Sequence, residues 1–165
     1  MQWFDAGQFG FYSDFQKGTH FEEFGFKIGM AMPGRPGALY HRESHQEGFL
    51  VLSGEALLIV EGEERPLRAW DYFHCPAGVE HIIVGAGDGP CVLLGVGGRV
   101  GPGDPVYPVN DLALKHGAGV EHETAVPKEA FPRGHTGAVS RGLPAGLVAS
   151  ALHPSALRPN LRMHK

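Results

Sequence analysis

Residues 47–60 read EGFLVLSGEALLIV and consist of two apolar runs on either side of Ser53-Gly54. Branched apolar side chains favour strands, and a Ser-Gly pair is typical of a turn between them. We therefore predict one short strand over 47–52 and a second over 55–60. The second run is followed by a hairpin-like turn and by a third predicted strand over 65–68, its antiparallel neighbour.

Similar short runs continue in both directions from this stretch. They are separated by clusters of Gly and Pro, such as Pro33-Gly34-Arg35-Pro36-Gly37, that neither a helix nor a strand runs through. About eight short strands without a long helical period predict an all-β sandwich, jelly roll or barrel rather than a βαβ fold. The remaining strands are predicted over residues 24–32, 38–43, 72–75, 81–84 and 91–96.

The strand-rich part of the chain defines the predicted domain organisation. We assign residues 1–23 to an N-terminal segment, 24–98 to the barrel and 99–165 to a C-terminal extension. The extension is predicted to be irregular and partly helical, with a short helix opening at Asn110 and another within 121–131. From Pro132 onward Gly, Pro, Ala and Arg dominate without periodicity, which indicates an irregular arm.

Composition narrows the class of protein. The 165 residues are 42% hydrophobic and 19% charged, which is typical of one folded domain. A net charge of −4 lacks the basic footprint of a nucleic-acid binder, and the apolar runs are too short for membrane association. The start of the sequence has no signal-peptide pattern, so we expect a cytoplasmic protein in which Cys75 and Cys91 are buried free thiols.

Histidine and glutamate residues gather around the predicted strands. Side chains two positions apart share a face of a strand, so His41 and Glu43 point the same way. Glu47 opens the next strand, and His81 starts a later one just after a Pro-x-Gly turn. Two histidines and a carboxylate make a nitrogen and oxygen site suited to Mn, Fe, Co, Ni or Zn. We expect metal affinity to fall as the pH drops through about 6.5, where free histidine protonates.

These residues resemble the two sequence motifs of the cupin superfamily. In the first motif a histidine precedes a glutamate, which is followed seven positions later by a glycine; in the second, a Pro-x-Gly turn is followed by a histidine. The resemblance covers roughly residues 34–96, and it implies a double-stranded β-helix (jelly-roll) barrel with a bound divalent metal. The matching residues are His41, Glu47 and Gly54 in the first motif and Pro76, Gly78 and His81 in the second.

The sequence departs from the cupin pattern at the fourth ligand. Glu43 stands where the first motif has a second histidine, Trp70 replaces a glycine, and Gly85 replaces the final asparagine. Two residues are alternatives for the missing fourth ligand. His45 can restore a third imidazole, which coordination chemistry favours, whereas Glu43 can ligate directly, which turn geometry favours. The predicted ligand set is His41, His45, Glu47 and His81, with Glu43 as the alternative to His45.

The cupin resemblance implies a fold shared by dioxygenases, decarboxylases, isomerases, storage proteins and sugar-sensing domains, so the fold alone selects no reaction. Our first hypothesis is a small-molecule metalloenzyme of one of the first three types. The alternatives are a non-catalytic module that binds a small ligand and a metal-free structural barrel. We expect a homodimer, because cupin barrels commonly pair through sheet edges. The predicted pocket residues are Tyr40, Phe49, Tyr72 and His74.

Overall fold

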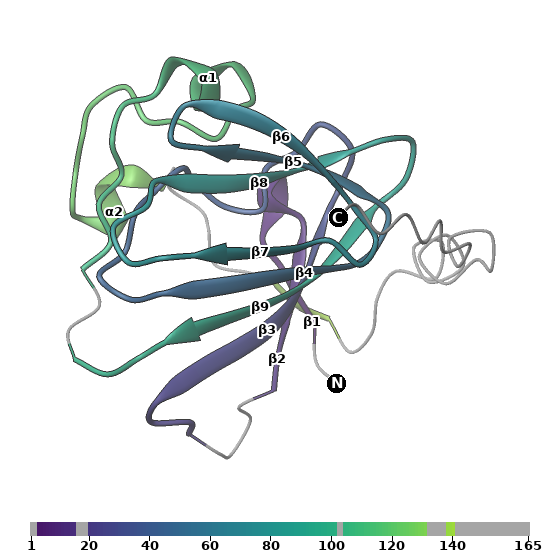
Figure 1. The fold of residues 1–165 in the computed structure, drawn as a ribbon, viewed down its shortest axis with the longest axis horizontal. Coiled ribbons are helices and arrows are strands. Elements are labelled where there is room, and N and C mark those ends of the chain that lie inside the picture. Colours follow the sequence, from purple (N-terminus) through teal and green to yellow (C-terminus); the bar gives the residue numbers. More distant parts are fainter. Residues whose placement is uncertain (1–2, 16–19, 102–103, 132–137, 141–165) are drawn as a thin grey trace, which may run out of the picture.

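A computed structural model describes residues 3–15, 20–101, 104–131 and 138–140. Within them, two antiparallel sheets face each other, as Figure 1 shows. The larger sheet has the strand order β10-β1-β2-β3-β9-β4-β7 and the smaller the order β6-β5-β8. The strands of the larger sheet are β1 (Trp3–Asp5), β2 (Phe11–Asp14), β3 (Phe24–Ala31), β4 (Glu47–Ser53), β7 (Tyr72–Cys75), β9 (Cys91–Gly98) and β10 (Ala138–Ser140). Those of the smaller sheet are β5 (Glu55–Val60), β6 (Glu63–Arg68) and β8 (His81–Ala86).

The hydrophobic core lies between the two sheets. Val51 of β4 and Leu93 of β9 pack in one cluster with Leu58 and Val60 of β5 and Ile83 of β8. Each of these side chains alternates along its strand with a side chain on the opposite face, as a half-buried strand requires. Two facing sheets that share one core make an all-β jelly roll, which confirms the predicted fold class. The hydrogen-bonded ladders remain two separate sheets, so the barrel is open.

Gly54 is where the chain passes from one sheet to the other. The strand before it, β4, belongs to the larger sheet and the strand after it, β5, to the smaller. Gly54 has a φ of 79°, and a Cβ at this position would lie 2.5 Å from the Pro90 carbonyl oxygen. Only glycine satisfies both conditions without strain, which explains why the turn between the two apolar runs carries this residue.

Two of the predicted elements need correction. Residues 38–43 are not a strand, because only His41 and Arg42 form single bridges, to His81 and Val106. The predicted N-terminal segment contributes β1 and β2, which extend the larger sheet beyond β3. Their runs of three and four residues are too short for alternation to be recognised in the sequence.

The described part of the extension packs at one end of the barrel. It contains α1 (Asp111–Lys115) and the single-turn α2 (Pro127–Ala130). The remaining helical element among the described residues, the 3-10 turn η1 (Gly7–Phe9), lies between β1 and β2. The side chain of Asn110 accepts hydrogen bonds from the Leu112 and Ala113 amides, each at 3.0 Å, which confirms the predicted helix start. Most of the predicted arm beyond Pro132 lies outside the described residues.

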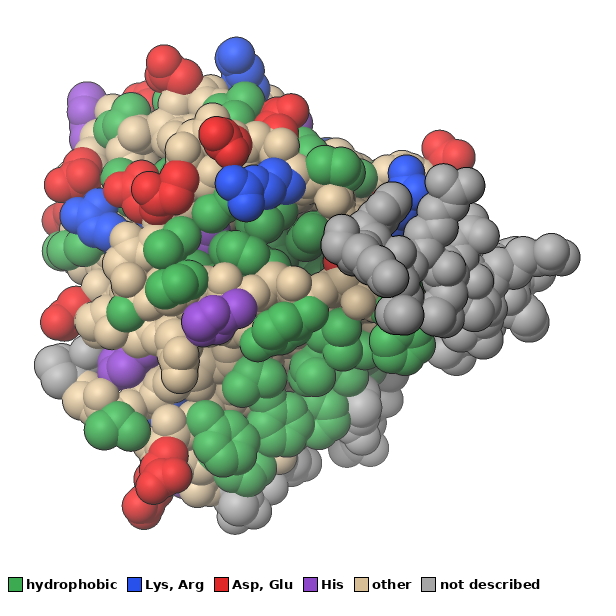
Figure 2. Space-filling view, in the orientation of Figure 1, with side chains coloured by type: hydrophobic (Ala, Val, Ile, Leu, Met, Phe, Trp, Pro, Cys, Tyr) green, Lys and Arg blue, Asp and Glu red, His purple; other side chains and the backbone are tan. Residues whose placement is uncertain are grey.

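The outer face of the larger sheet is apolar. Figure 2 shows hydrophobic side chains gathered over the region of β3 and β9, and Phe24 and Val96 of these strands are among the exposed large apolar residues. Patches of this kind are typical of contact surfaces. Among the described residues, no helix is both long and apolar enough to cross a membrane.

Candidate metal centre

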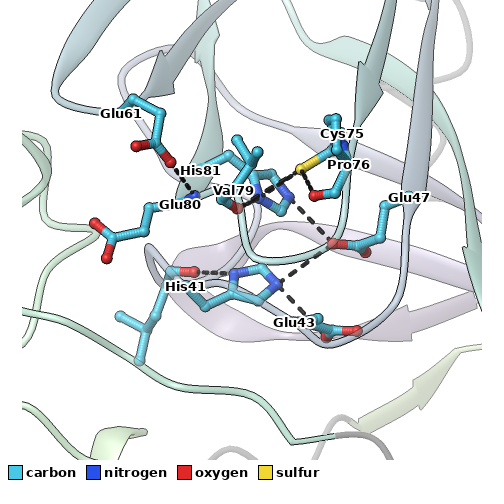
Figure 3. Close-up of polar contacts among 10 residues, drawn as sticks. His41, Glu43, Glu47, Glu61, Cys75, Pro76, Val79, Glu80 and His81 are labelled. Carbon is cyan, nitrogen blue, oxygen red and sulfur yellow. Dashed lines mark hydrogen bonds and ion pairs between the residues drawn. The ribbon is translucent and has the colours of Figure 1, made fainter.

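Three side chains converge inside the barrel from separate parts of the chain (Figure 3). His41 and His81 face each other across a backbone bridge, in which each amide donates to the other residue's carbonyl at 3.1 and 2.9 Å. Glu47 is the first residue of β4 and His81 the first of β8. The Oε2 atom of Glu47 lies 3.2 Å from His81 Nε2 and 3.9 Å from His41 Nε2. One ligand atom from each residue lies within 4.8 Å of the other two.

Backbone carbonyls orient both imidazole rings. His41 Nδ1 lies 2.7 Å from the Leu39 carbonyl, and His81 Nδ1 lies 3.1 Å from the Val79 carbonyl. A carbonyl can only accept a hydrogen bond, so each Nδ1 carries a proton and donates it. In the neutral ring this leaves the lone pair on Nε2, which is the atom that each histidine directs at Glu47.

The atoms at the centre of the cluster lack hydrogen bonds. Glu47 Oε2 and His81 Nε2 are buried and have no hydrogen-bond partner of acceptable geometry among the described residues. The two atoms face each other at 3.2 Å, but neither has the hydrogen bond that a buried polar atom normally makes. A transition metal bound about 2.0–2.2 Å from nitrogen and oxygen ligands would pair with both. The residues present therefore fit a divalent ion.

Burial and neighbouring charges shift the pKa values of the two histidines in opposite directions. Burial, assisted by the charge of His81, lowers the pKa of His41 to about 4. Burial also acts to lower the pKa of His81, but the adjacent Cys75 thiol and Glu47 carboxylate outweigh this effect and raise the pKa to about 10. Burial acts to raise the pKa of Glu47, and the neighbouring His81 lowers it overall. Without a metal, the centre is a His81 imidazolium beside a Glu47 carboxylate and a neutral His41.

The structure places the two alternatives for the fourth ligand differently. Glu43 is half-buried, with Oε1 at 3.6 Å from His41 Nε2, at the edge of the cluster. His45 is also half-buried, but its Nε2 lies 2.7 Å from the Val100 carbonyl oxygen and is not among the three converging ligand atoms. The turn between His41 and Glu47 directs this imidazole outward, so the preference for His45 over Glu43 is not supported by the geometry.

A cavity of about 250 Å³ adjoins the cluster, and we call it the inner cavity. Its wall includes His41, Glu43, Glu47, His81 and Tyr107. A second hollow of about 550 Å³, the outer recess, shares part of this wall and is also lined by Arg99 and His20. Both therefore meet at the candidate ligands, which leaves room for a small molecule beside an ion.

The predicted pocket residues are only partly in this space. Phe49 lines both hollows. Tyr40 is instead buried in the core with Ile59 and Ile82. Tyr72 is 63% exposed, and His74 is exposed with Nε2 at 3.2 Å from Gln46 Oε1. Neither Tyr72 nor His74 lines either hollow, because both alternate with residues on the inner face of β7.

Lys27, Tyr107 and Phe131 are among the side chains of the inner cavity that sequence reasoning missed. Lys27 lies on β3, whereas Tyr107 and Phe131 come from the C-terminal extension and stack edge-on with ring centroids 5.7 Å apart. A period-two signal was available for Lys27, since it stands between Gly25 and Gly29 on one face of its strand. No local sequence pattern predicts that the C-terminal extension contacts the site.

The fold and the cluster together define a class of protein: an antiparallel jelly roll with nitrogen and oxygen ligands converging inside the barrel. Residues 29–97 match the family model described as a cupin domain. The chain therefore contains a cupin domain over these residues. Lys27, Tyr107 and Phe131 lie outside the matched residues.

Several solved structures share this fold. A sugar phosphate isomerase from a cupin superfamily, from Silicibacter pomeroyi, is 25% identical over 59% of this chain and 63% of its own, with a TM-score of 0.53. A putative sugar phosphate isomerase from Acidithiobacillus ferrooxidans is 24% identical over 58% and 61%, with a TM-score of 0.52. A cupin 2 domain-containing protein from Halorhodospira halophila is 19% identical over 63% and 72%, with a TM-score of 0.53. The chain spans less than two thirds of the length of the two isomerases. A search among curated proteins gave no match.

Proposed function

We propose that this protein is a metal-dependent enzyme that catalyses proton transfer on a small organic substrate, as an isomerase does. The observation that carries the proposal is that Glu47 Oε2 and His81 Nε2, two buried atoms 3.2 Å apart without a hydrogen bond of acceptable geometry, lie beside His41 Nε2 and next to the inner cavity. Ligand atoms on one side and open space on the other are typical of catalytic rather than structural metal sites.

His41, Glu47 and His81 hold the ion in this proposal, and the Leu39 and Val79 carbonyls fix the rings that present the nitrogen ligands. A divalent ion at this position acts as a Lewis acid, which polarises a substrate carbonyl and acidifies the neighbouring C–H bond. A proton acceptor is then needed within reach of that carbon.

Glu43 is the candidate acceptor. Its carboxylate lies beside the cluster and lines the inner cavity. Burial and the charge of Glu47 raise its pKa, which makes it a stronger base than an exposed glutamate. Tyr107 lines the same cavity, and burial together with the charge of Glu43 raises the pKa of its hydroxyl, so the hydroxyl stays protonated at neutral pH and can donate to a substrate oxygen.

The structural comparison supports an isomerase over the dioxygenase and decarboxylase types. The relative from Silicibacter pomeroyi is described as a sugar phosphate isomerase, and aldose-ketose isomerisation is a proton transfer next to a carbonyl. A free carboxylate beside the ligands is what such a transfer needs and what dioxygen chemistry does not require.

The first test is the metal content of protein purified without a histidine tag. We expect about one transition-metal ion per chain in the wild type, little in His81→Gln, and wild-type content in Glu43→Gln. His74→Gln is the matched control, because His74 is an exposed histidine outside the cluster. Wild-type protein that takes up no metal would contradict the proposal and favour the metal-free barrel.

The second test is solvent exchange at substrate carbon. Keto- and aldo-sugars and their phosphates are incubated in D₂O with the metal-loaded protein, and deuterium incorporation is followed by NMR. We expect incorporation in at least one compound, and a loss of 10²-fold or more in Glu43→Gln at unchanged metal content. Binding of these compounds without exchange would favour the non-catalytic ligand-binding module.

A further inference from the structure

The wall formed by β3, β9 and β4 is hollow on its inner face. Inward-facing positions of neighbouring strands form rows across the sheet. One row contains Gly25, Gly97 and Glu47, and the next contains Lys27, Gly95 and Phe49. The Arg99 guanidinium covers Gly25, whereas Gly95 and Gly97 meet only the flanking Phe49, Lys27 and Glu47 side chains, so the wall beside Lys27 and Glu47 is left thin.

Lys27 uses the space left by Gly95. A Cβ on Gly95 would lie 3.6 Å from the Phe49 ring and 3.9 Å from Lys27 Cγ, so the ring and the lysine stem flank the glycine. Lys27 lines both the inner cavity and the outer recess. Lys27 therefore lies where the outer recess adjoins the inner cavity, on the way from solvent to the candidate metal centre.

The ammonium of Lys27 is close to two carboxylates without being paired to either. Its charge contributes to lowering the pKa of both Glu43 and Glu47. Among the described residues, however, no nitrogen-oxygen distance of 4.0 Å or less joins Lys27 to a carboxylate. It also donates no hydrogen bond within this part of the chain. Its three N–H groups remain available to a ligand.

The charge of the metal-loaded centre points the same way. Among the charged side chains that line the inner cavity, Glu43 and Glu47 would balance a divalent ion, and His41 and His81 would be neutral as ligands, so the charge of Lys27 would remain. The remaining wall of the inner cavity is largely apolar and includes Leu39, Leu93 and Phe131. A ligand that balances this charge carries one anionic group, and one that fits this wall has a small apolar or weakly polar body.

We propose that Lys27 is the anion-binding residue of this site and that the substrate is a small organic anion, whose carboxylate or phosphate group pairs with the lysine while the rest of the molecule enters the inner cavity. This inference deepens the proposed function and rests on it for the position of the reacting end. The contrasting possibility is that Lys27 only offsets the charge of Glu43 and Glu47, in which case its removal leaves ligand binding unchanged.

The experiment compares Lys27→Met and Lys27→Arg with the wild type. Lys115→Met is the matched control, since it removes the same charge from the exposed end of α1, outside both hollows. The probes are butyrate and inorganic phosphate as anions and butyramide as the neutral analogue of butyrate. Dissociation constants are measured by ligand-observed NMR relaxation on metal-loaded protein, and the metal content of every sample is measured in parallel.

We expect Lys27→Met to weaken binding of at least one anion by about tenfold or more, because a hydrogen bond to a charged group contributes about 1.5–3 kcal/mol. Butyramide binding should be unchanged, Lys27→Arg should stay within about threefold of the wild type, and Lys115→Met should match it. Metal affinity should be equal or higher in Lys27→Met, because a positive charge has been removed from beside the ion. Which anion responds identifies the carboxylate or the phosphate as the preferred group.

Three results would overturn the inference: wild-type protein that binds neither anion, Lys27→Met that binds both as the wild type does, or Lys115→Met that loses as much affinity as Lys27→Met. Failure of the proposed function has a separate signature. Wild-type protein without metal contradicts the metal centre, whatever the anions do, whereas full metal content with anion binding independent of Lys27 contradicts the anion site alone.

Discussion

The two halves of the barrel interior are built from the same alternating strands but are filled differently. In one half, Val51, Leu58 and Ile83 interdigitate between the sheets and exclude solvent. In the other, Gly95 and Gly97 lie beside Lys27 and Glu47 in the wall of an open cavity that Glu43 also lines. The packed half therefore stabilises the fold, whereas the hollow half can bind an ion and a small molecule. Each glycine removes apolar contacts and leaves space for a ligand.

The packed half should carry most of the folding free energy. Leu58→Ala removes a side chain that is 1% exposed and leaves a cavity, so we expect the free energy of unfolding to fall by about 2–5 kcal/mol. Chemical denaturation of metal-free protein measures this loss. Metal stoichiometry should be unchanged under native conditions; loss of metal in a variant that is still folded would contradict the separation of the two halves.

The hollow half should carry the metal. Glu47→Gln replaces the carboxylate that lies between the two histidines, and we expect metal affinity to fall by about 10²-fold or more, as measured by calorimetric titration. The matched control is Glu64→Gln, in which the carboxylate pairs with His116 outside both hollows. Equal metal affinity in both variants would remove Glu47 from the ligand set.

Metal binding should release protons. His81 has a pKa of about 10 in the metal-free centre and must lose its proton before Nε2 can ligate. The apparent affinity should therefore rise about tenfold per pH unit from pH 6 to 8, with about one proton released per ion. His41, with a pKa of about 4, should add a second proton only near or below that pH.

Calorimetry in buffers of different ionisation enthalpy measures this proton release. A pH-independent affinity between 6 and 8 would exclude His81 as a ligand. The sequence alone predicts that metal affinity falls only below about pH 6.5, the pKa of free histidine. A pH-dependent affinity up to pH 8 is therefore a consequence of the buried His81–Glu47 pair.

The smallest effect on stability is expected for a substitution that adds a methyl group to the glycine-lined wall of the hollow half. A Cβ on Gly95 meets only ordinary van der Waals contacts, so Gly95→Ala should change the free energy of unfolding by less than about 1 kcal/mol while weakening binding of small anions. Gly54→Ala is the contrasting variant. Its positive φ and the close Pro90 carbonyl should cost about 1–3 kcal/mol, as measured by thermal unfolding. Equal stability losses would mean that Gly95 has a structural role.

The alternation of residues 47–60 and the Gly54 turn predicted the two central strands, because strand periodicity and turn chemistry are local properties. The same reasoning failed for 38–43, where the chain pairs only at His41 and Arg42. It also missed β1 and β2, whose short runs become strands only because β3 offers a free edge.

By itself the sequence predicted the fold class and the grouping of His41, Glu47 and His81, since the two cupin-like motifs set the spacing of these residues relative to their turns. Only the tertiary structure decided that Glu43 rather than His45 lies beside them, and that Lys27 and Tyr107 reach the same cavity. These placements depend on which way a turn directs a side chain and on contacts between distant segments. Neither is encoded in local periodicity, because both arise when the two sheets pack.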